Sequence, residues 1–258
     1  MGALAGRRVD LNSDLGESFG AYRIGADDAL LGLVSSANVA CGFHGGDPRV
    51  LAATVAAARE RRVAVGAHPG YPDLVGFGRR DLAASPEEVT ADVLYQLGAL
   101  GAFCRAAGVP MRHVKAHGAL SNRAVTDPAT AGAIVAAVRA YDADLVVLSQ
   151  PGALIDAAEA AGLPVAREAF ADRAYNPDGT LVSRRLPGAL VTDPARAADR
   201  MARLLAEGSL PTVGGADLTL SVDSICVHAD TPGAAEIMAA VRARLTAEGV
   251  AIRPPGDA

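Results

Sequence analysis

The chain has 258 residues, half of them apolar, and a formal net charge of −5 at pH 7. This length suits one α/β barrel of about 250 residues, so we expect a single barrel-like domain over residues 1–258. The arginines are scattered among acidic residues, which excludes the basic stripe of a nucleic-acid-binding protein. No apolar stretch reaches the roughly 20 residues of a membrane span, which predicts a cytoplasmic protein with no membrane partner.

Lys115 is the single lysine among 24 basic residues. Arginine cannot replace a lysine that acts as a compact charge or titrates when desolvated. We therefore interpret Lys115 as retained for its amine, chance survival being the alternative. The three cysteines are odd in number and far apart, which favours free thiols over a disulfide framework.

Short apolar runs alternate with longer amphipathic ones. The short runs predict strands over residues 8–12, 35–40, 63–67, 113–116, 144–149, 164–168 and 221–227. Helices are predicted between them, with N-terminal signals at Asp47-Pro48, Ser85-Pro86, Asp127-Pro128, Asp193-Pro194 and Thr231-Pro232. Seven β-then-α units predict an α/β fold of the (β/α) TIM-like barrel type. An open doubly wound sheet is the alternative.

Nearly all the unusual polar residues directly follow the predicted strands. In barrel enzymes, the loops at the carboxyl ends of the strands carry the active site. A closed ring of strands would bring these loops together, so we expect a catalytic domain whose site includes Lys115.

The first motif, residues 10–17, places Asp10, Asn12 and Asp14 at alternate positions, which share one face of a strand. With Glu17, these acids suit a general base or a cation site. The alternative is an Asx turn with caps.

Two further motifs contribute histidines. His44 lies in a glycine-rich turn in which Asp47 is the expected N-cap, and Cys41 beside it is expected to be a buried packing group. His68 ends a strand and enters a long loop that carries Arg79. Such a loop is typical of a substrate lid, although a purely structural histidine is the alternative.

In the fourth motif, His113, Lys115 and His117 recur with a period of two. A desolvated lysine beside an imidazole can stabilise an oxyanion or a phosphate and relay a proton. Separately, His44 and His68 with Asp14 would form a divalent-cation site. A Walker-type nucleotide site is excluded because G-x-x-x-x-G-K-[ST] does not occur.

The motifs, in this order, carry a family resemblance. DLNSDLGE at 10–17, SANVACGFHGGDP at 36–48, VAVGAHPGYPD at 63–73 and HVKAHGALSN at 113–122 are followed by EAFADRAY at 168–175, LVSRRLPGA at 181–189 and ICVHADTP at 225–232. From Val9 to about Arg253, the chain resembles the LamB/YcsF family of lactam-utilisation proteins. Ala116 and Ser121, which flank Lys115 and His117, depart from the family pattern and bear on substrate preference.

The resemblance implies a distorted, seven-stranded barrel of the glycoside hydrolase/deacetylase type. It also implies the role of the A subunit in an ATP-dependent 5-oxoprolinase, which converts 5-oxo-L-proline to L-glutamate. ATP would then be the co-substrate, a divalent cation an additional candidate cofactor, and subunits B and C the partners.

For that reaction, Lys115 is the expected electrostatic stabiliser of the activated lactam. Protons would be handled by His117 or His44 with an acid among Asp10, Asp14 and Glu17. The expected substrate-binding residues are Asn12, Asn38, His68, Arg79, Asn122, Glu168, Arg173, Arg184 and His228, among which an arginine would hold the substrate carboxylate. The alternatives are a metal-dependent amidohydrolase or deacetylase that needs no ATP, and a non-catalytic lactam-binding subunit.

Overall fold

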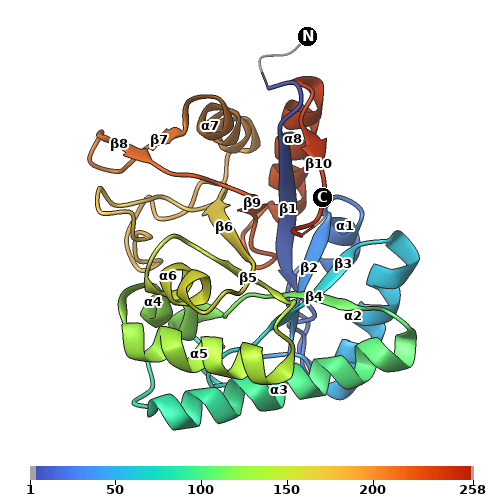
Figure 1. Ribbon diagram of the computed structural model, residues 1–258. Coiled ribbons are helices and arrows are strands. Elements are labelled where there is room, and N and C mark those ends of the chain that lie inside the picture. The colour runs from blue at the N-terminus through green and yellow to red at the C-terminus, as the bar shows by residue number, and fades with distance from the viewer. Residues whose placement is uncertain (1–3, 257–258) are drawn as a thin grey trace.

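The structure, a computed structural model, describes residues 4–256. Seven parallel strands within this range close into a barrel in the order β1-β2-β3-β4-β5-β6-β9, and β9 pairs again with β1 (Figure 1). Their bounds are β1 Arg8–Leu15, β2 Ser36–Ala40, β3 Ala64–His68, β4 Met111–Val114, β5 Val146–Ser149, β6 Val165–Phe170 and β9 Ser224–Cys226. The closed ring confirms the predicted barrel and rules out the open sheet.

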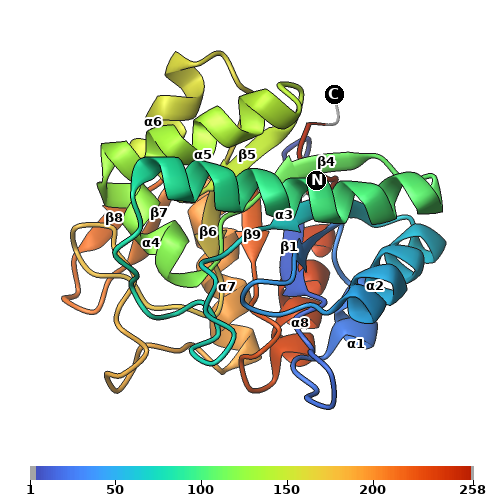
Figure 2. The same cartoon turned by 90° about the horizontal axis from the view of Figure 1, so that it is seen from below.

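Helices surround the strands (Figure 2). They are α1 Asp27–Leu31, α2 Pro48–Arg61, α3 Pro86–Ala107, α4 Gly118–Thr126, α5 Pro128–Tyr141, α6 Ala153–Ala160, α7 Pro194–Glu207 and α8 Ala234–Ala247. Their apolar faces pack on the barrel and on one another, so α3 packs against α5 and α7 against α8. The barrel wall is therefore buried on its outer side by helices.

The predicted helix starts are mostly confirmed. Ser85 and Glu88 form a capping box at α3, and Asp47, Asp127 and Asp193 accept backbone N–H groups at α2, α5 and α7. The prediction at Thr231-Pro232 was wrong, because α8 begins at Ala234 and its N-cap, Gly233, makes no side-chain cap. The Thr231 hydroxyl instead donates to Asp172 at 2.6 Å.

Three short strands were not predicted. β7 Ser209–Pro211 and β8 Asp217–Thr219 form an antiparallel pair at the edge of the molecule, away from the barrel (Figures 1 and 2). β10 Ala251–Ile252 adds in parallel to the start of β1.

Strand β4 ends one residue before Lys115, but the backbone continues to bond to the neighbouring segment. The Lys115 N–H donates to the Ala67 carbonyl at 2.9 Å, and the His117 N–H donates to the Pro69 carbonyl at 2.8 Å. This pairing preserves the alternation of side chains beyond the strand. Lys115 and His117 therefore follow His113 into the barrel interior, where all three are buried.

A row of hydrogen bonds crosses the barrel interior. The register places Asp14 beside Asn38, Asn38 beside Gly66, and Gly66 beside His113. His113 Nε2 lies 2.7 Å from Asn38 Oδ1, and the Asn38 amide donates to Asp14 at 2.8 Å. Gly66 leaves the space that the His113 ring occupies, because a Cβ there would lie 2.2 Å from the ring.

Asp10 lies nearer the amino ends of the strands, in a pocket of hydroxyl groups. Its carboxylate accepts hydrogen bonds from Ser35 at 2.7 Å, from Ser36 at 2.9 Å, and from Ser224. Burial nevertheless raises the pKa of Asp10 to about 6, because desolvation outweighs these hydrogen bonds.

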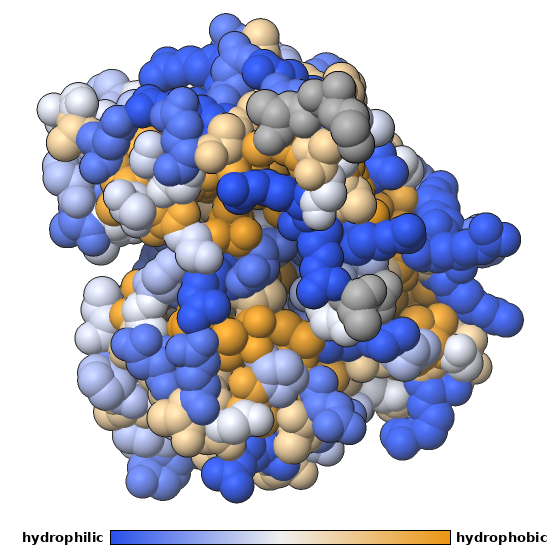
Figure 3. Space-filling model, turned by 45° about the horizontal axis from the view of Figure 1, so that its top comes forward, coloured by the Kyte–Doolittle hydropathy of each residue, from blue (hydrophilic) through white to orange (hydrophobic). Residues whose placement is uncertain are grey.

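The face shown in Figure 3 carries many hydrophilic side chains, with apolar side chains visible between them. Within residues 4–256, no helix combines the length and the apolar character that crossing a membrane requires.

The close packing of the His113 ring against Gly66 leads to a prediction about stability. Gly66→Ala should lower the free energy of unfolding by about 1–3 kcal/mol, because the added methyl overpacks a closed interior. Gly98→Ala is the matched control, because Gly98 lies in α3 with open space around it. This change should raise the free energy of unfolding by about 0.5–1 kcal/mol. Urea unfolding of both variants measures the difference, and equal effects would contradict the packing argument.

The raised pKa of Asp10 predicts that the free energy of unfolding depends on pH. Its pKa is higher in the folded chain than in the unfolded chain, so its contribution to stability is largest below about pH 4 and is lost as the pH rises through about 6. Asp10→Asn removes this titration. Between about pH 4 and pH 7, the free energy of unfolding of the variant should rise by about 2 kcal/mol relative to that of the wild type, measured by urea unfolding at both pH values. A difference independent of pH would show that Asp10 does not titrate in this range.

Candidate active site

A cavity of about 490 Å³ opens at the carboxyl ends of the barrel strands. Each of six strands supplies a lining residue at or just after its end: Asp14, His68, Lys115, Gln150, Phe170 and His228. The long segment 180–185 and the start of α4 complete the wall. The predicted convergence of the polar loops is therefore present.

Lys115 lies in the wall of this cavity and is 4% exposed. Its Nζ is 2.9 Å from both Asp14 Oδ1 and Glu168 Oε1, and 3.3 Å from Asn12 Oδ1. Asn12 also donates to Glu168 at 2.9 Å. Burial opposes the ammonium form, but the Asp14 carboxylate and its neighbours raise the pKa of Lys115 well above its usual value. Lys115 is thus a fixed cation at neutral pH.

Two neighbours of Lys115 were not predicted. Cys226 Sγ lies 3.1 Å from Nζ, and the ammonium lies 5.2 Å from the centre of the Phe170 ring, within reach of a cation–π contact. Phe170 follows Glu168 by two residues, and Cys226 precedes His228 by two. The period-two rule could therefore have found both residues once Glu168 and His228 were chosen.

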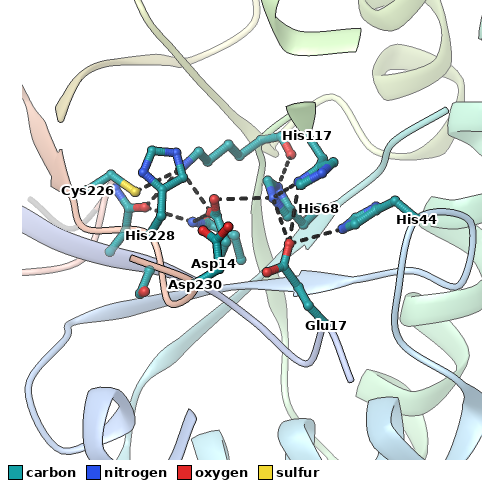
Figure 4. Close-up of polar contacts among 12 residues, drawn as sticks. Asp14, Glu17, His44, His68, His117, Cys226, His228 and Asp230 are labelled. Carbon is teal, nitrogen blue, oxygen red and sulfur yellow. Dashed lines mark hydrogen bonds and ion pairs between the residues drawn. The ribbon is translucent and has the colours of Figure 1, made fainter. Parts of the chain in front are cut away.

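On the opposite side of Asp14, three histidines surround Glu17 (Figure 4). Glu17 Oε1 lies 3.3 Å from His44 Nε2, 3.4 Å from His117 Nδ1 and 4.0 Å from His68 Nε2. All four side chains are buried, and their ligand atoms lie within 4.8 Å of one another. This is a group that could hold a metal ion.

The electrostatics of this group favour neutral His44 and His117 rings beside an acid that titrates near neutrality. Burial lowers the pKa of His44 and of His117 well below the usual histidine value. Burial, followed by the Asp14 carboxylate, raises the pKa of Glu17 to about 7. Such a pair of groups can exchange a proton at physiological pH.

Arginines line the outer part of the cavity. Arg79 is paired with Asp230 at 2.8 Å, and Arg184 lies 3.5 Å from the same carboxylate. Arg173 donates to the Val182 carbonyl at 2.6 Å, and its buried Nε has no hydrogen-bond partner. Burial, followed by repulsion from Arg184, lowers the pKa of Arg173 to about 10, so its guanidinium is still charged at neutral pH.

The amino end of α4 faces the same cavity through Gly118, Ala119 and Ser121. Its N-cap residue, His117, makes no side-chain cap. Helix N-termini favour anions, so α4 adds to the positive potential of the arginines. Asn122, in the next position, also lines the cavity.

His228 is held by a second buried acid. Its Nδ1 lies 3.0 Å from Asp172, and its ring stacks on Phe170 with centroids 4.9 Å apart. Asp172 was not predicted, although it follows Phe170 by two residues.

The remaining predicted residues lie outside the cavity wall. Asn12, Asn38 and Glu168 form the hydrogen-bonded layer that holds Asp14 and Lys115, and Asp10 lies deeper among its serines. Burial raises the pKa of Cys41 to about 12, as expected for a packing thiol.

With this geometry established, comparison with known proteins identifies the relatives of the chain. The A subunit of 5-oxoprolinase from Symbiobacterium thermophilum is 53% identical over 99% of this chain and 99% of its own length. The protein of the same name from Pyrococcus furiosus is 49% identical over 97% of this chain and 98% of its own length.

A solved structure of the lactam utilization protein from Thermus thermophilus is also similar. It is 50% identical, covers 95% of this chain and 99% of its own, and superposes with a TM-score of 0.90. The LamB/YcsF family matches residues 9–258. The chain therefore belongs to the LamB/YcsF family.

Proposed function

We propose that the chain is the A subunit of an ATP-dependent 5-oxoprolinase, with the barrel as its catalytic domain and subunits B and C as partners. The observation that carries the proposal is the buried Lys115 ammonium, fixed by Asp14 and Glu168 in the wall of a cavity rich in arginine. The names of the relatives, which align over nearly their whole length, support the same activity.

The chemistry of the substrate explains why such a cavity is useful. A five-membered lactam is a poor electrophile, and transfer of the γ-phosphoryl group of ATP to its carbonyl oxygen, with release of ADP, would make the ring carbon more electrophilic. Water can then attack that carbon, and the C–N bond breaks to give an acyl phosphate with a free amine. A second water cleaves the acyl phosphate to L-glutamate and phosphate. Each of these steps concentrates negative charge on oxygen atoms beside the lactam, where Lys115 would stabilise it.

The other parts of the site fit the remaining tasks. His44, which stacks on His117 and lies 3.3 Å from Glu17, would accept and return protons. Arg173 is the best anchor for the substrate carboxylate, because Arg79 and Arg184 already face Asp230. The amino end of α4 would favour a phosphoryl group or a carboxylate.

The proposal is tested by measuring L-glutamate formed from 5-oxo-L-proline. We expect formation only when this chain, subunits B and C, and ATP are all present. Glutamate formed by this chain alone without ATP would instead identify a metal-dependent amidohydrolase. Full turnover by subunits B and C without this chain would show that this chain is a non-catalytic, lactam-binding subunit.

Substituting the lysine tests its role. Lys115→Met should lower ATP-dependent glutamate formation by the complex about 100- to 1000-fold, the range for loss of one charge-stabilising donor. It should also destabilise the fold by roughly 3–5 kcal/mol, because Asp14 and Glu168 lose their counter-charge.

A second variant separates function from stability. Lys115→Met combined with Glu168→Gln removes one positive and one negative charge, so urea unfolding should show that much of the stability returns. Glutamate formation should stay low. Recovery of turnover to within about tenfold of the wild type would show that Lys115 is only structural.

The proposed role of Arg173 in binding the substrate carboxylate leads to a separate prediction. Arg173→Lys should raise the KM for 5-oxo-L-proline roughly 10- to 100-fold, because a bidentate charged contact is lost. Arg185→Lys is the control, since Arg185 lines the cavity but is exposed, and it should change KM little. With 2-pyrrolidinone, a lactam without the carboxylate, Arg173→Lys and the wild type should react equally slowly. An equal loss on both lactams would argue against the anchor.

A further inference from the structure

The hydrogen bonds of two histidines fix which of their nitrogens carries a proton. His117 Nε2 lies 2.8 Å from the Phe77 carbonyl, and His68 Nδ1 lies 2.7 Å from the Lys115 carbonyl. A carbonyl oxygen only accepts hydrogen bonds, so each of these nitrogens is the N–H. In the neutral form of each ring, the other nitrogen, His117 Nδ1 or His68 Nε2, carries the lone pair that a metal ion would bind.

These two lone pairs point into the same small space. His117 Nδ1 and His68 Nε2 are 3.0 Å apart, and their ring planes meet at 89°. Asp14 Oδ2 lies 3.4 Å from His68 Nε2, and Glu17 Oε1 lies 3.4 Å from His117 Nδ1 (Figure 4). Glu17 Oε1 is buried without a hydrogen-bond partner. His117 Nδ1, His68 Nε2, Asp14 Oδ2 and Glu17 Oε1 thus converge on one buried space, where a bound cation would pair with both carboxylates.

We propose that Asp14, Glu17, His68 and His117 bind one divalent transition-metal ion in the wall of the cavity. Bonds of 2.0–2.1 Å in a tetrahedral zinc site put neighbouring ligand atoms about 3.3 Å apart. Four separations among these atoms, His117–His68, Asp14–His68, Glu17–His117 and Glu17–His68, run from 3.0 to 4.0 Å. Two imidazoles favour zinc, iron or cobalt over Mg²⁺, which takes oxygen ligands. The backbone carbonyls that orient both rings are the outer partners such ligands need.

His44 does not belong to this ligand set. Its ring is stacked on His117, with centroids 3.7 Å apart and planes at 1°. Lone pairs lie in the ring planes, so two stacked rings direct them along parallel planes and cannot both point at one ion. His44 Nε2 lies 3.3 Å from Glu17 Oε1, with no hydrogen bond between them. The set predicted from sequence, His44, His68 and Asp14, is thus revised: His117 and Glu17 take the place of His44.

Asp14, Cys226 and His228 form a second group that could hold an ion. Here the Lys115 ammonium lies 2.9 Å from Asp14 Oδ1 and 3.1 Å from Cys226 Sγ. A fixed positive charge at this position repels a cation, which favours the first group. In that group, Asp14, His68 and His117 line the cavity, so the ion would face the substrate.

The test uses Co²⁺ as a spectroscopic probe of the full chain, freed of metal by a chelator. The wild type should bind one equivalent with visible d–d absorption, and Zn²⁺ should displace it. His117→Ala and Glu17→Gln should each weaken binding by more than about 100-fold. His44→Phe, which retains the stacked ring, and His228→Asn should bind within a few-fold of the wild type. Thermal unfolding checks that every variant is folded.

Three results would overturn the proposal. If the folded wild type binds neither ion at micromolar concentration, a shared proton fills the space instead. If His228→Asn loses the ion while His117→Ala keeps it, the ion lies beside Cys226. If His44→Phe abolishes binding, the ligand set predicted from sequence is restored. The proposal concerns the site on which the proposed function rests, but no turnover is measured, so the two can fail separately.

Discussion

The buried contact of Lys115 with Asp14 and Glu168 constrains the whole interior of the barrel. Taking three charges out of water costs several kcal/mol for each ion, and their attraction offsets this cost only with good geometry and further hydrogen bonds. The barrel supplies them through Asn12, which donates to Glu168, and Asn38, which donates to Asp14. Because Lys115 and Asn38 both bind Asp14 Oδ1, the other oxygen of Asp14 is left to face His68.

The closed, parallel ring explains why so many strands meet at this contact. Along each strand, alternate residues point inward, and parallel strands end on the same side. Six of the seven strands therefore offer an inward residue at the cavity. Asp14 and Lys115 line the cavity, whereas Asn38 and His113 are buried in the barrel interior and do not line it. Asp10 is two steps below Asp14 on β1, too deep to meet a ligand.

Much of this arrangement could be predicted from the sequence. The seven barrel strands follow from apolar runs, and the caps at Asp47 and Ser85 follow from local chemistry that needs no tertiary contact. Period-two spacing correctly places His113, Lys115 and His117 on one side. β7, β8 and β10 were missed because two or three residues are too few to show a periodic pattern.

The grouping of Glu17 with the histidines could not be predicted in this way. Glu17 lies beyond the end of β1, after Gly16, whose positive φ of 68° turns the chain. His44 lies in a turn where Gly46 has a positive φ of 80°. The period of a strand says nothing about side-chain direction after such a turn. Only the tertiary packing, which stacks His44 on His117, brings these side chains together.

The polar atoms without partners show where the fold gives up stability. A buried polar atom that lacks a hydrogen bond costs about 1–3 kcal/mol. Four of the eight such side-chain atoms in the described chain are Glu17 Oε1, both nitrogens of His44, and Arg173 Nε. Arg173 lines the cavity, and Glu17 and His44 contact His117, which also lines it. A fold that satisfies the hydrogen bonds of Asp10 and Asn38 could have satisfied these too. Their clustering argues that a ligand, rather than the protein, completes them.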